Sequence, residues 1–192
     1  MERKFILTDK FVINSFGIKL FQIKCTKSFK YAQKGDFGGY VEKEGNLDQE
    51  NDAWVSGNAW VSGNAWVSGD AWVSGDAWVS GDARVSGNAR VFGNARVSGN
   101  ARVSGNARVS GNADIENDNE HCGFDGFGSC NRHTHAYMTK EKKVEIICGC
   151  FRGSIEEFEK KVEETHSGTV YEKQYKSIIN VIKIKFGLTD FT

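Results

Sequence analysis

Residues 76–87 read DAWVSGDARVSG, and this stretch contains the repeat that decides the fold. An alanine recurs every six residues from Ala53 to Ala113, and a valine recurs every six residues from Val55 to Val109. Within residues 76–87 the one bulky position changes from tryptophan to arginine, while the alanine, valine, serine and glycine positions keep their residue type. A short period without interruption indicates a repeat architecture, in which each unit packs only on its neighbours.

The overall composition excludes several classes of protein. The chain has 192 residues and a formal net charge of zero, so no global basic field favours nucleic acid and no acidic field favours a cationic partner. The opening MERKFILTDK lacks the apolar run of a signal peptide, and no stretch approaches the ~18 apolar residues of a membrane span. Five cysteines without a secretory signal fit a reducing compartment. We therefore expect a cytoplasmic protein.

The repeat has a recognisable relative. Written from its aliphatic position, the unit V-S-G-N-A-R resembles the hexapeptide repeat of left-handed parallel β-helices. The resemblance implies that three units close one triangular coil of eighteen residues, and that coils stack at the ~4.8 Å strand spacing. We expect a mainly β fold, with a left-handed parallel β-helix of about four coils over residues 45–116. Residues 1–44 form an N-terminal β cap, and residues 117–192 form a C-terminal α+β domain in this prediction.

The position that carries tryptophan or arginine follows the small inward alanine, so its side chain should point out of the coil. With eighteen residues per coil, three columns form on three faces: Trp54, Trp72, Arg90 and Arg108; Trp60, Trp78 and Arg96; Trp66, Arg84 and Arg102. These ten residues are the candidate ligand-binding or partner-binding residues. Where a guanidinium follows an indole in a column, the two can form a cation–π contact.

Outward tryptophans need a cover, because soluble monomers rarely expose large apolar patches. Three explanations remain open. The tryptophan faces could be buried between protomers of a homotrimer, as is common among proteins with this helix. The N-terminal strands could fold back over them. The indoles and guanidiniums could also bind a foreign partner or ligand, since Trp and Arg are frequent at interface hot spots.

The N-terminal segment alternates apolar and polar residues in three places. The pattern predicts strands at Lys4–Thr8, Phe11–Asn14 and Ile18–Cys25, with a turn between the last two at Asn14–Gly17. These strands would form a small sheet that caps the repeat.

The C-terminal segment begins with a glycine-rich stretch that reads as a linker, ENDNEHCGFDGFGS. Two strands are predicted after it, at His135–Thr139 and Val144–Cys148. A first helix starts after Ser154, which forms a capping box with Glu157. A second helix is predicted from about Tyr171 to Phe186, ended by a glycine.

Catalytic and metal-binding chemistry has little support. Hexapeptide acyltransferases use a histidine base and often a loop inserted between repeats, and related carbonic anhydrases hold zinc with three histidines. Residues 53–113 contain neither a histidine nor an insertion, so we predict no catalytic residue and favour a non-enzyme. The metal-ligand candidates are Cys130, His133, Cys148 and Cys150, which could hold a structural zinc; no other cofactor is expected.

Two stretches resemble proteins of mobile elements. Residues 35–63, GDFGGYVEKEGNLDQENDAWVSGNAWVSG, resemble the entry to the repeats in hexapeptide-repeat proteins of bacteriophages and prophages, which are labelled putative transferases or polymer-forming proteins. Residues 148–175, CGCFRGSIEEFEKKVEETHSGTVYEKQY, resemble a small C-terminal domain from the same elements. The resemblance implies a phage or prophage context and supplies no catalytic residues.

That context leads to a functional hypothesis. We expect a non-enzymatic, oligomeric binding protein that counters a host defence system, either by sequestering a nucleotide signal or by blocking a host protein. A homotrimer is the expected assembly, and nucleic acid is not an expected partner. The alternatives are a hexapeptide-type acyltransferase and a structural, virion-associated module.

Overall fold

The computed structural model describes residues 3–188 and divides into two compact units, residues 1–117 and residues 118–192. The first unit contains the repeat together with the N-terminal strands, and the second is the C-terminal α+β region. Within the described residues, no helix combines the length and the apolar character that crossing a membrane requires.

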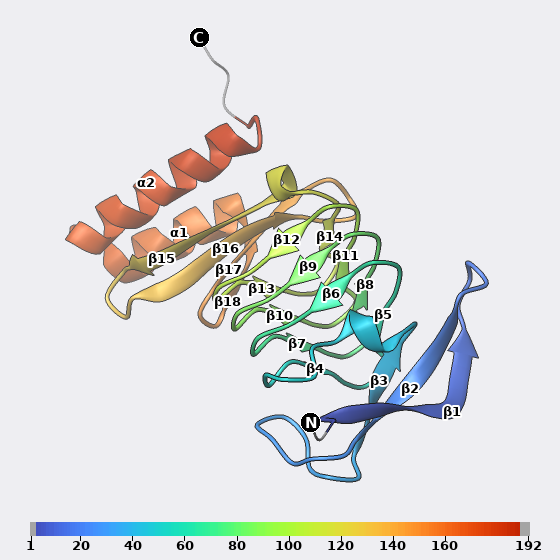
Figure 1. Ribbon diagram of the computed structural model, residues 1–192. Coiled ribbons are helices and arrows are strands. Elements are labelled where there is room, and N and C mark those ends of the chain that lie inside the picture. Colours follow the sequence, from blue (N-terminus) through green and yellow to red (C-terminus); the bar gives the residue numbers. More distant parts are fainter. Residues whose placement is uncertain (1–2, 189–192) are drawn as a thin grey trace. The chain divides into compact units, whose positions relative to one another are not determined.

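The repeat forms a β-solenoid of stacked parallel coils (Figure 1). Trp54 pairs with Trp72, and Trp72 pairs in turn with Arg90, so each coil contains eighteen residues as predicted. The strands are two residues long: β4 (Trp54–Val55), β5 (Trp60–Val61), β6 (Trp66–Val67), β7 (Trp72–Val73), β8 (Trp78–Val79), β9 (Arg84–Val85), β10 (Arg90–Val91), β11 (Arg96–Val97), β12 (Arg102–Val103), β13 (Arg108–Val109) and β14 (Asp114–Ile115).

The solenoid has three faces, each a parallel sheet. The first face contains β4, β7, β10 and β13, the second contains β5, β8, β11 and β14, and the third contains β6, β9 and β12. With four strands on the first face, the solenoid has about four turns. The mainly β fold with a central solenoid is thereby confirmed, and so are the three predicted columns.

Two residue types fill the interior of the coils. Every valine of the repeat is fully buried, and the alanines are buried as well. Valine suits this place because its branched side chain packs well within a parallel sheet that is buried on its inner face. The glycines lie at the corners with positive φ, as at Gly81, where φ is +67°. A Cβ atom on Gly81 would lie 2.9 Å from the backbone nitrogen of Gly99 in the next coil, so the corner excludes a side chain.

The N-terminal strands join the solenoid rather than forming a separate sheet. They are β1 (Phe5–Ile13), β2 (Lys19–Cys25) and β3 (Phe37–Val41), followed by a short 3₁₀ helix, η1 (Glu44–Asn46). β3 pairs in parallel with β5, so all three strands extend the second face. The strands predicted at Lys4–Thr8 and Phe11–Asn14 form one continuous strand, β1. A bulge between Leu7 and Phe11 accounts for the break in the alternation of apolar and polar residues.

Lys4 holds the start of the chain against the first coil. Its Nζ donates hydrogen bonds to the carbonyl oxygens of Asn51 (2.5 Å) and Ala53 (2.8 Å), and lies 5.2 Å from the centre of the Phe29 ring. Burial lowers the pKa of Lys4 to about 8, and the carboxylates of Asp48 and Asp52 oppose the shift only in part. The charged amine is therefore held in a site that desolvates it.

A pH-dependent stability follows from Lys4. In the unfolded chain a lysine has a pKa of about 10.4, so above pH 8 the folded protein binds fewer protons at this residue than the unfolded chain does. The contribution of Lys4 to the free energy of unfolding should therefore increase from pH 8 to pH 10. The Lys4→Met variant should lack that increment, which urea titrations of both proteins at four pH values would measure. A constant difference between the two proteins across this range would contradict the assignment.

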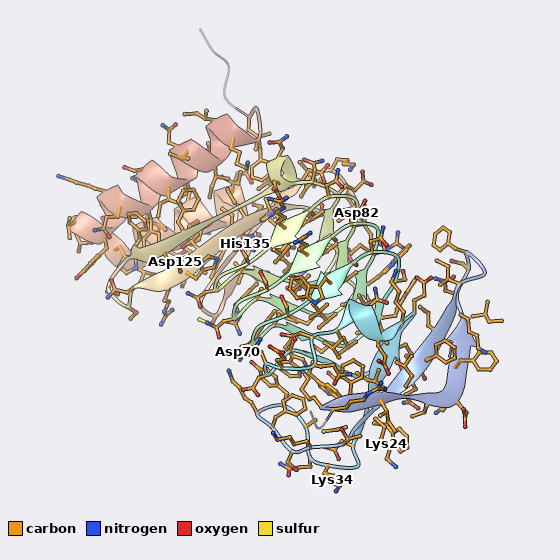
Figure 2. All side chains as sticks on the ribbon, viewed as in Figure 1. Lys24, Lys34, Asp70, Asp82, Asp125 and His135 are labelled. Atoms are coloured by element: carbon orange, nitrogen blue, oxygen red, sulfur yellow. The ribbon has the colours of Figure 1, made fainter. Side chains whose placement is uncertain are left out.

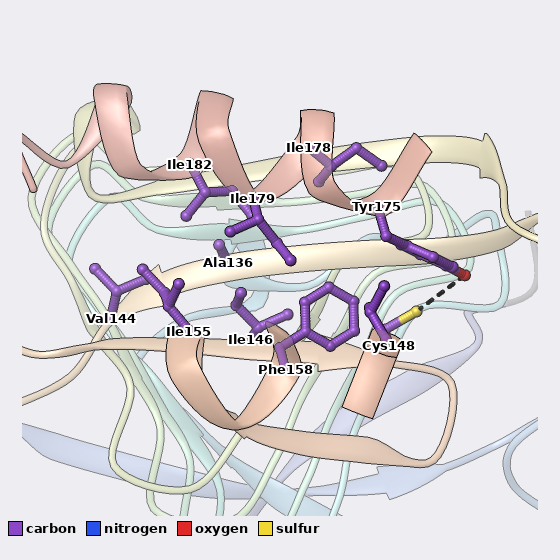
Figure 3. Packing of buried hydrophobic residues seen from close by; sticks show 11 residues of the cluster. Ala136, Val144, Ile146, Cys148, Ile155, Phe158, Tyr175, Ile178, Ile179 and Ile182 are labelled. Atoms are coloured by element: carbon purple, nitrogen blue, oxygen red, sulfur yellow. Dashed lines mark hydrogen bonds between the residues drawn. The ribbon is translucent and has the colours of Figure 1, made fainter. Parts of the chain in front are cut away.

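The C-terminal unit is an antiparallel sheet with two helices on one side. The sheet contains β15 (His121–Phe127), β16 (Arg132–Met138), β17 (Val144–Cys148) and β18 (Phe151–Ser154), in that order, after a short 3₁₀ helix, η2 (Asp118–Glu120). The helices are α1 (Ile155–His166) and α2 (Val170–Lys185). Figure 3 shows their apolar side chains, including Phe158 and Ile179, meeting Ala136 and Ile146 of the sheet.

The unit has four strands where the sequence predicted two. The stretch read as a linker forms β15, because Cys122 and Phe124 pack against the helical core at alternating positions and Phe127 packs there beyond a bulge. Glycines at 123 and 126 gave this strand a loop-like composition. A Cβ on Gly123 would lie 2.7 Å from the His133 ring, so that glycine makes room for a neighbouring side chain.

The predicted capping box is confirmed at the start of α1. The Ser154 hydroxyl accepts a hydrogen bond from the Glu157 amide, and the Glu157 carboxylate accepts one from the Ser154 amide. Replacing Ser154 by alanine should destabilise the C-terminal unit by about 1 kcal/mol, since one helix amide loses its partner. Thermal unfolding would measure this loss, with Ser167→Ala, outside the box, as the matched control. Equal losses in the two variants would contradict the capping role.

Candidate functional site

The ten predicted residues form three outward columns on the solenoid, but their exposure differs. Trp54 is 2% exposed, whereas Trp66 is 42% exposed. Arg84, Arg96 and Arg102 are exposed, and the others, Trp60, Trp72, Trp78, Arg90 and Arg108, are half-buried. Only some of these ten side chains are therefore available to a ligand or a partner.

The N-terminal segment of the same chain covers much of the tryptophan half. Rings from this segment lie against three indoles: Phe29 on Trp54 (centroids 5.3 Å apart), Tyr31 on Trp72 (5.6 Å) and Phe16 on Trp78 (5.3 Å). The Tyr31 hydroxyl also donates a hydrogen bond to the Asp70 carbonyl oxygen (3.1 Å). Of the three explanations for the outward tryptophans, folding back of the N-terminal segment accounts for these contacts. Trp66 keeps the most exposed indole.

Indoles within a column also contact each other and a serine side chain. Trp60 and Trp78 stack with ring centroids 4.4 Å apart and planes inclined by 13°. Trp72 donates a hydrogen bond from Nε1 to the Ser56 hydroxyl (2.8 Å). These contacts fix the orientation of the Trp60, Trp72 and Trp78 indoles.

Two of the three predicted indole–guanidinium pairs form. The Arg90 guanidinium lies 5.7 Å from the Trp72 ring centre, and the Arg96 guanidinium lies 5.0 Å from the Trp78 ring centre. Within the described part of the chain, Trp66 and Arg84 make no such contact. The third face therefore leaves both of these side chains exposed.

The solenoid is electrically asymmetric along its axis. Residues 53–82 contain three aspartates and no basic residue, whereas residues 83–112 contain five arginines and no acidic residue. All three aspartates have partners: Asn58 donates to Asp76 (3.0 Å), Asn64 donates to Asp82 (3.1 Å), and Lys30 lies 3.7 Å from Asp70. Asp70 and Asp82 are labelled in Figure 2.

The arginine half has no comparable neutralisation at its centre. Among residues 3–188, no carboxylate forms an ion pair with Arg84, Arg90 or Arg96. Guanidiniums without a carboxylate partner on three sides of one coil produce a positive potential that favours anions.

A small pocket lies on the first face, where the tryptophan half meets the arginine half. It has a volume of about 210 Å³ and is lined by Trp72, Ser74, Arg90, Phe92 and Arg108. Arg90 and Arg108 are direct partners in the parallel pair β10–β13, so their guanidiniums rise from neighbouring coils. The pocket combines two cations with two aromatic walls.

Two residues of this pocket, Ser74 and Phe92, were not among the predicted binding residues, and Phe92 is the one that departs from the repeat. From Ser56 to Ser110 the residue after each valine of the repeat is a serine, with one exception, Phe92. This single break in a strict column was the signal that could have located the pocket. An aromatic side chain there borders the guanidinium pair, which a serine would leave open.

The structure separates the predicted metal-ligand candidates. Cys148 is buried on the helix side, where Thr134 donates to its thiol (3.3 Å). His133 precedes Thr134 and so faces the other side of the sheet, where its Nδ1 lies 2.8 Å from an Asp125 oxygen. Cys130 and Cys150 are exposed. In residues 3–188, no three His, Cys, Asp or Glu side chains are grouped so that they could hold a metal ion.

Comparison with known proteins supports the repeat. The family model described as YdcK beta solenoid repeat matches residues 53–69, 83–99, 95–111 and 101–115. No curated protein matches the chain. Together with the stacked coils, the match shows that this chain is a β-solenoid repeat protein, and it concerns the repeat alone.

Proposed function

We propose that this protein is a non-enzymatic binding protein that holds a nucleotide on the first face of its solenoid, where the tryptophan half meets the arginine half. The observation that carries the proposal is the pocket lined by Trp72, Arg90, Phe92 and Arg108. Its guanidiniums are suited to a phosphate, because the planar fork of arginine donates two parallel hydrogen bonds to phosphate oxygens. Its rings are suited to a base, because stacking on an aromatic side chain stabilises any base.

The size and openness of the site favour binding over chemistry. A pocket of about 210 Å³ at the surface holds part of a nucleotide and leaves the remainder in solvent. Its lining offers no histidine, carboxylate or thiol that could act as a base or a nucleophile. A ligand held in this way would be sequestered unchanged.

The resemblance to phage and prophage hexapeptide-repeat proteins extends this proposal. In that context, sequestration would withdraw a nucleotide signal that a host defence system requires. The homotrimer belongs to the same proposal. In it, the exposed Trp66 indole would lie in the interface between protomers. Light scattering on the purified protein would test the trimer, and a monomer would remove it.

The binding test compares variants from different faces. Isothermal titration would use adenosine monophosphate, cyclic adenosine monophosphate and a cyclic dinucleotide, with adenosine and inorganic phosphate as partial ligands.

Arg90→Gln should weaken nucleotide binding by about tenfold, since one charge-assisted contact is lost. Phe92→Ser, which restores the serine of the other units, should have a similar effect. Arg84→Gln, on the third face, is the matched control and should bind normally.

Two results would overturn the nucleotide proposal. One is the absence of saturable binding for every nucleotide tested, and the other is equal binding by the three variants. Chromatography of the recovered ligand tests the non-enzymatic part, because conversion of the nucleotide, or turnover of acetyl coenzyme A in a parallel assay, would point to an enzyme.

A protein partner on the third face is the second candidate. Trp66, Arg84 and Arg102 are exposed there and lie in register on adjacent strands, which gives a flat ridge of hot-spot residue types. For such a partner, the variants that lose binding would be different ones. In a pull-down with candidate host proteins, Trp66→Ala and Arg84→Gln would abolish binding of the partner. Arg90→Gln and Phe92→Ser would leave it intact.

A further inference from the structure

The C-terminal unit contains a small pocket that is separate from the solenoid. Its volume is about 220 Å³, and its wall includes the aromatic rings of Phe151, Phe158 and Tyr175. Two cationic side chains, Arg132 and Lys161, also line it. An apolar floor with cations at its edge is a recurring form of binding site for amphipathic anions.

Two glycines make room for the polar groups of this pocket. Gly128 has φ of +73°, and a Cβ atom there would collide with the Tyr175 hydroxyl group. Gly149 has φ of +61°, and a Cβ atom there would lie 2.6 Å from Nη1 of Arg132. The turns β15–β16 and β17–β18 thus admit the phenol and the guanidinium through backbone that carries no side chain.

The Tyr175 hydroxyl can donate to a ligand when the Cys148 thiol donates to it, because either atom of this contact can be the donor. The hydroxyl lies 3.7 Å from the Cys148 thiol, and Figure 3 shows the oxygen and the sulfur pointing toward one another beside Phe158. Burial, together with the contact to Cys148, raises the pKa of Tyr175, so the phenol keeps its proton at neutral pH.

The charge at the edge of the pocket is positive. Arg132 is exposed and forms no ion pair with a carboxylate in the described residues, whereas Lys161 lies 3.5 Å from Glu164. One unpaired guanidinium matches one negative charge, and its planar fork matches the two oxygens of a carboxylate.

We propose that this pocket binds a small monocarboxylate with a flat apolar body, of the size of benzoate, with Arg132 on the carboxylate and the rings of Phe151 and Phe158 around the apolar body. The volume is below that of most cofactor sites, which limits the ligand to a single ring or a short chain. Inorganic phosphate lacks the apolar part and should not compete. The proposal does not depend on the solenoid or on its nucleotide site.

Titration of the full chain tests the proposal, with 4-fluorobenzoate followed by ¹⁹F NMR. Saturable binding with one site per chain is expected. Benzyl alcohol, the neutral analogue, is measured by its displacement of 4-fluorobenzoate and should bind at least about tenfold more weakly. Arg132→Gln should weaken 4-fluorobenzoate binding by about tenfold and leave benzyl alcohol binding unchanged. Lys160→Gln removes an exposed charge from the same helix as Lys161 but outside the pocket, and should bind as the wild type does.

The Tyr175→Phe variant tests the role of the hydroxyl group apart from that of the aromatic ring. This variant keeps the aromatic wall, so it should fold and should lose affinity for 4-fluorobenzoate by several-fold, with thermal unfolding as the check on integrity. The proposal is overturned if 4-fluorobenzoate does not saturate, if benzyl alcohol binds equally well, or if Arg132→Gln and Lys160→Gln have the same affinity.

Discussion

Replacing Trp54 by alanine is expected to lower the free energy of unfolding of the solenoid unit by about 3–5 kcal/mol. Its indole is 2% exposed and lies edge-on to the Phe29 ring, with centroids 5.3 Å apart and planes at 72°. The backbone of β3 also approaches it, since a Cβ on Gly38 would lie 2.7 Å from the indole Cζ2. Removing the indole would leave a cavity that this rigid surrounding backbone cannot close. Urea denaturation followed by circular dichroism would measure the loss.

Trp66→Ala is the matched control for this prediction. The two residues occupy the same position of the repeat, but Trp66 is 42% exposed, so its replacement should cost less than about 1 kcal/mol. Equal losses would mean that the N-terminal segment does not cover Trp54 in solution. The expected difference assigns Trp54 to folding and leaves Trp66 as the tryptophan most open to a partner.

Replacing Gly81 by alanine is expected to destabilise the solenoid by about 2–4 kcal/mol. A positive φ strains any residue with a Cβ, which costs about 1 kcal/mol or more, and a clash with rigid backbone adds about 1–3 kcal/mol. At Gly81 the added atom would lie 2.9 Å from the nitrogen and 3.0 Å from the oxygen of Gly99. Neither atom can move without displacing the next coil, because Asp82 donates its amide hydrogen to that same oxygen.

Gly105→Ala isolates the contribution of the coil contact. Gly105 has nearly the same φ, +65°, but nothing lies within 4 Å of its added Cβ. This variant should therefore show only the conformational cost of about 1 kcal/mol. Urea titrations of both variants would give the difference. If Gly105→Ala destabilised as strongly as Gly81→Ala, the stacking distance would not be what restricts the corner to glycine.

The solenoid illustrates how a strict period restricts a structure. The repeat of valine and alanine specified the inward positions, and the unbroken six-residue period specified both the eighteen-residue coil and the three columns. These features could be predicted because each coil packs only on its neighbours, so local sequence carries nearly all of the information. For the same reason the pairing of Trp72 with Arg90 and of Trp78 with Arg96 could be predicted.

The candidate site was predicted only in part. The sequence identified the arginines and tryptophans as outward residues, but not which of them a ligand can reach. Tyr31 on Trp72 and Phe16 on Trp78 come from loops outside the repeat, where no period indicates position. Phe92 was visible as a break in the serine column, yet its role depends on the guanidiniums of Arg90 and Arg108 beside it.

By itself, the sequence determined the coil, its interior and the face on which each bulky residue projects. Only the tertiary structure decided which indoles are buried, that β15 is a strand, and that Tyr175 and Arg132 meet at one pocket. The physical reason is the range of the contacts. A repeat is held by contacts at a fixed separation of eighteen residues, whereas the covering loops and the C-terminal pocket are held by side chains that meet at irregular separations, and no local pattern encodes those.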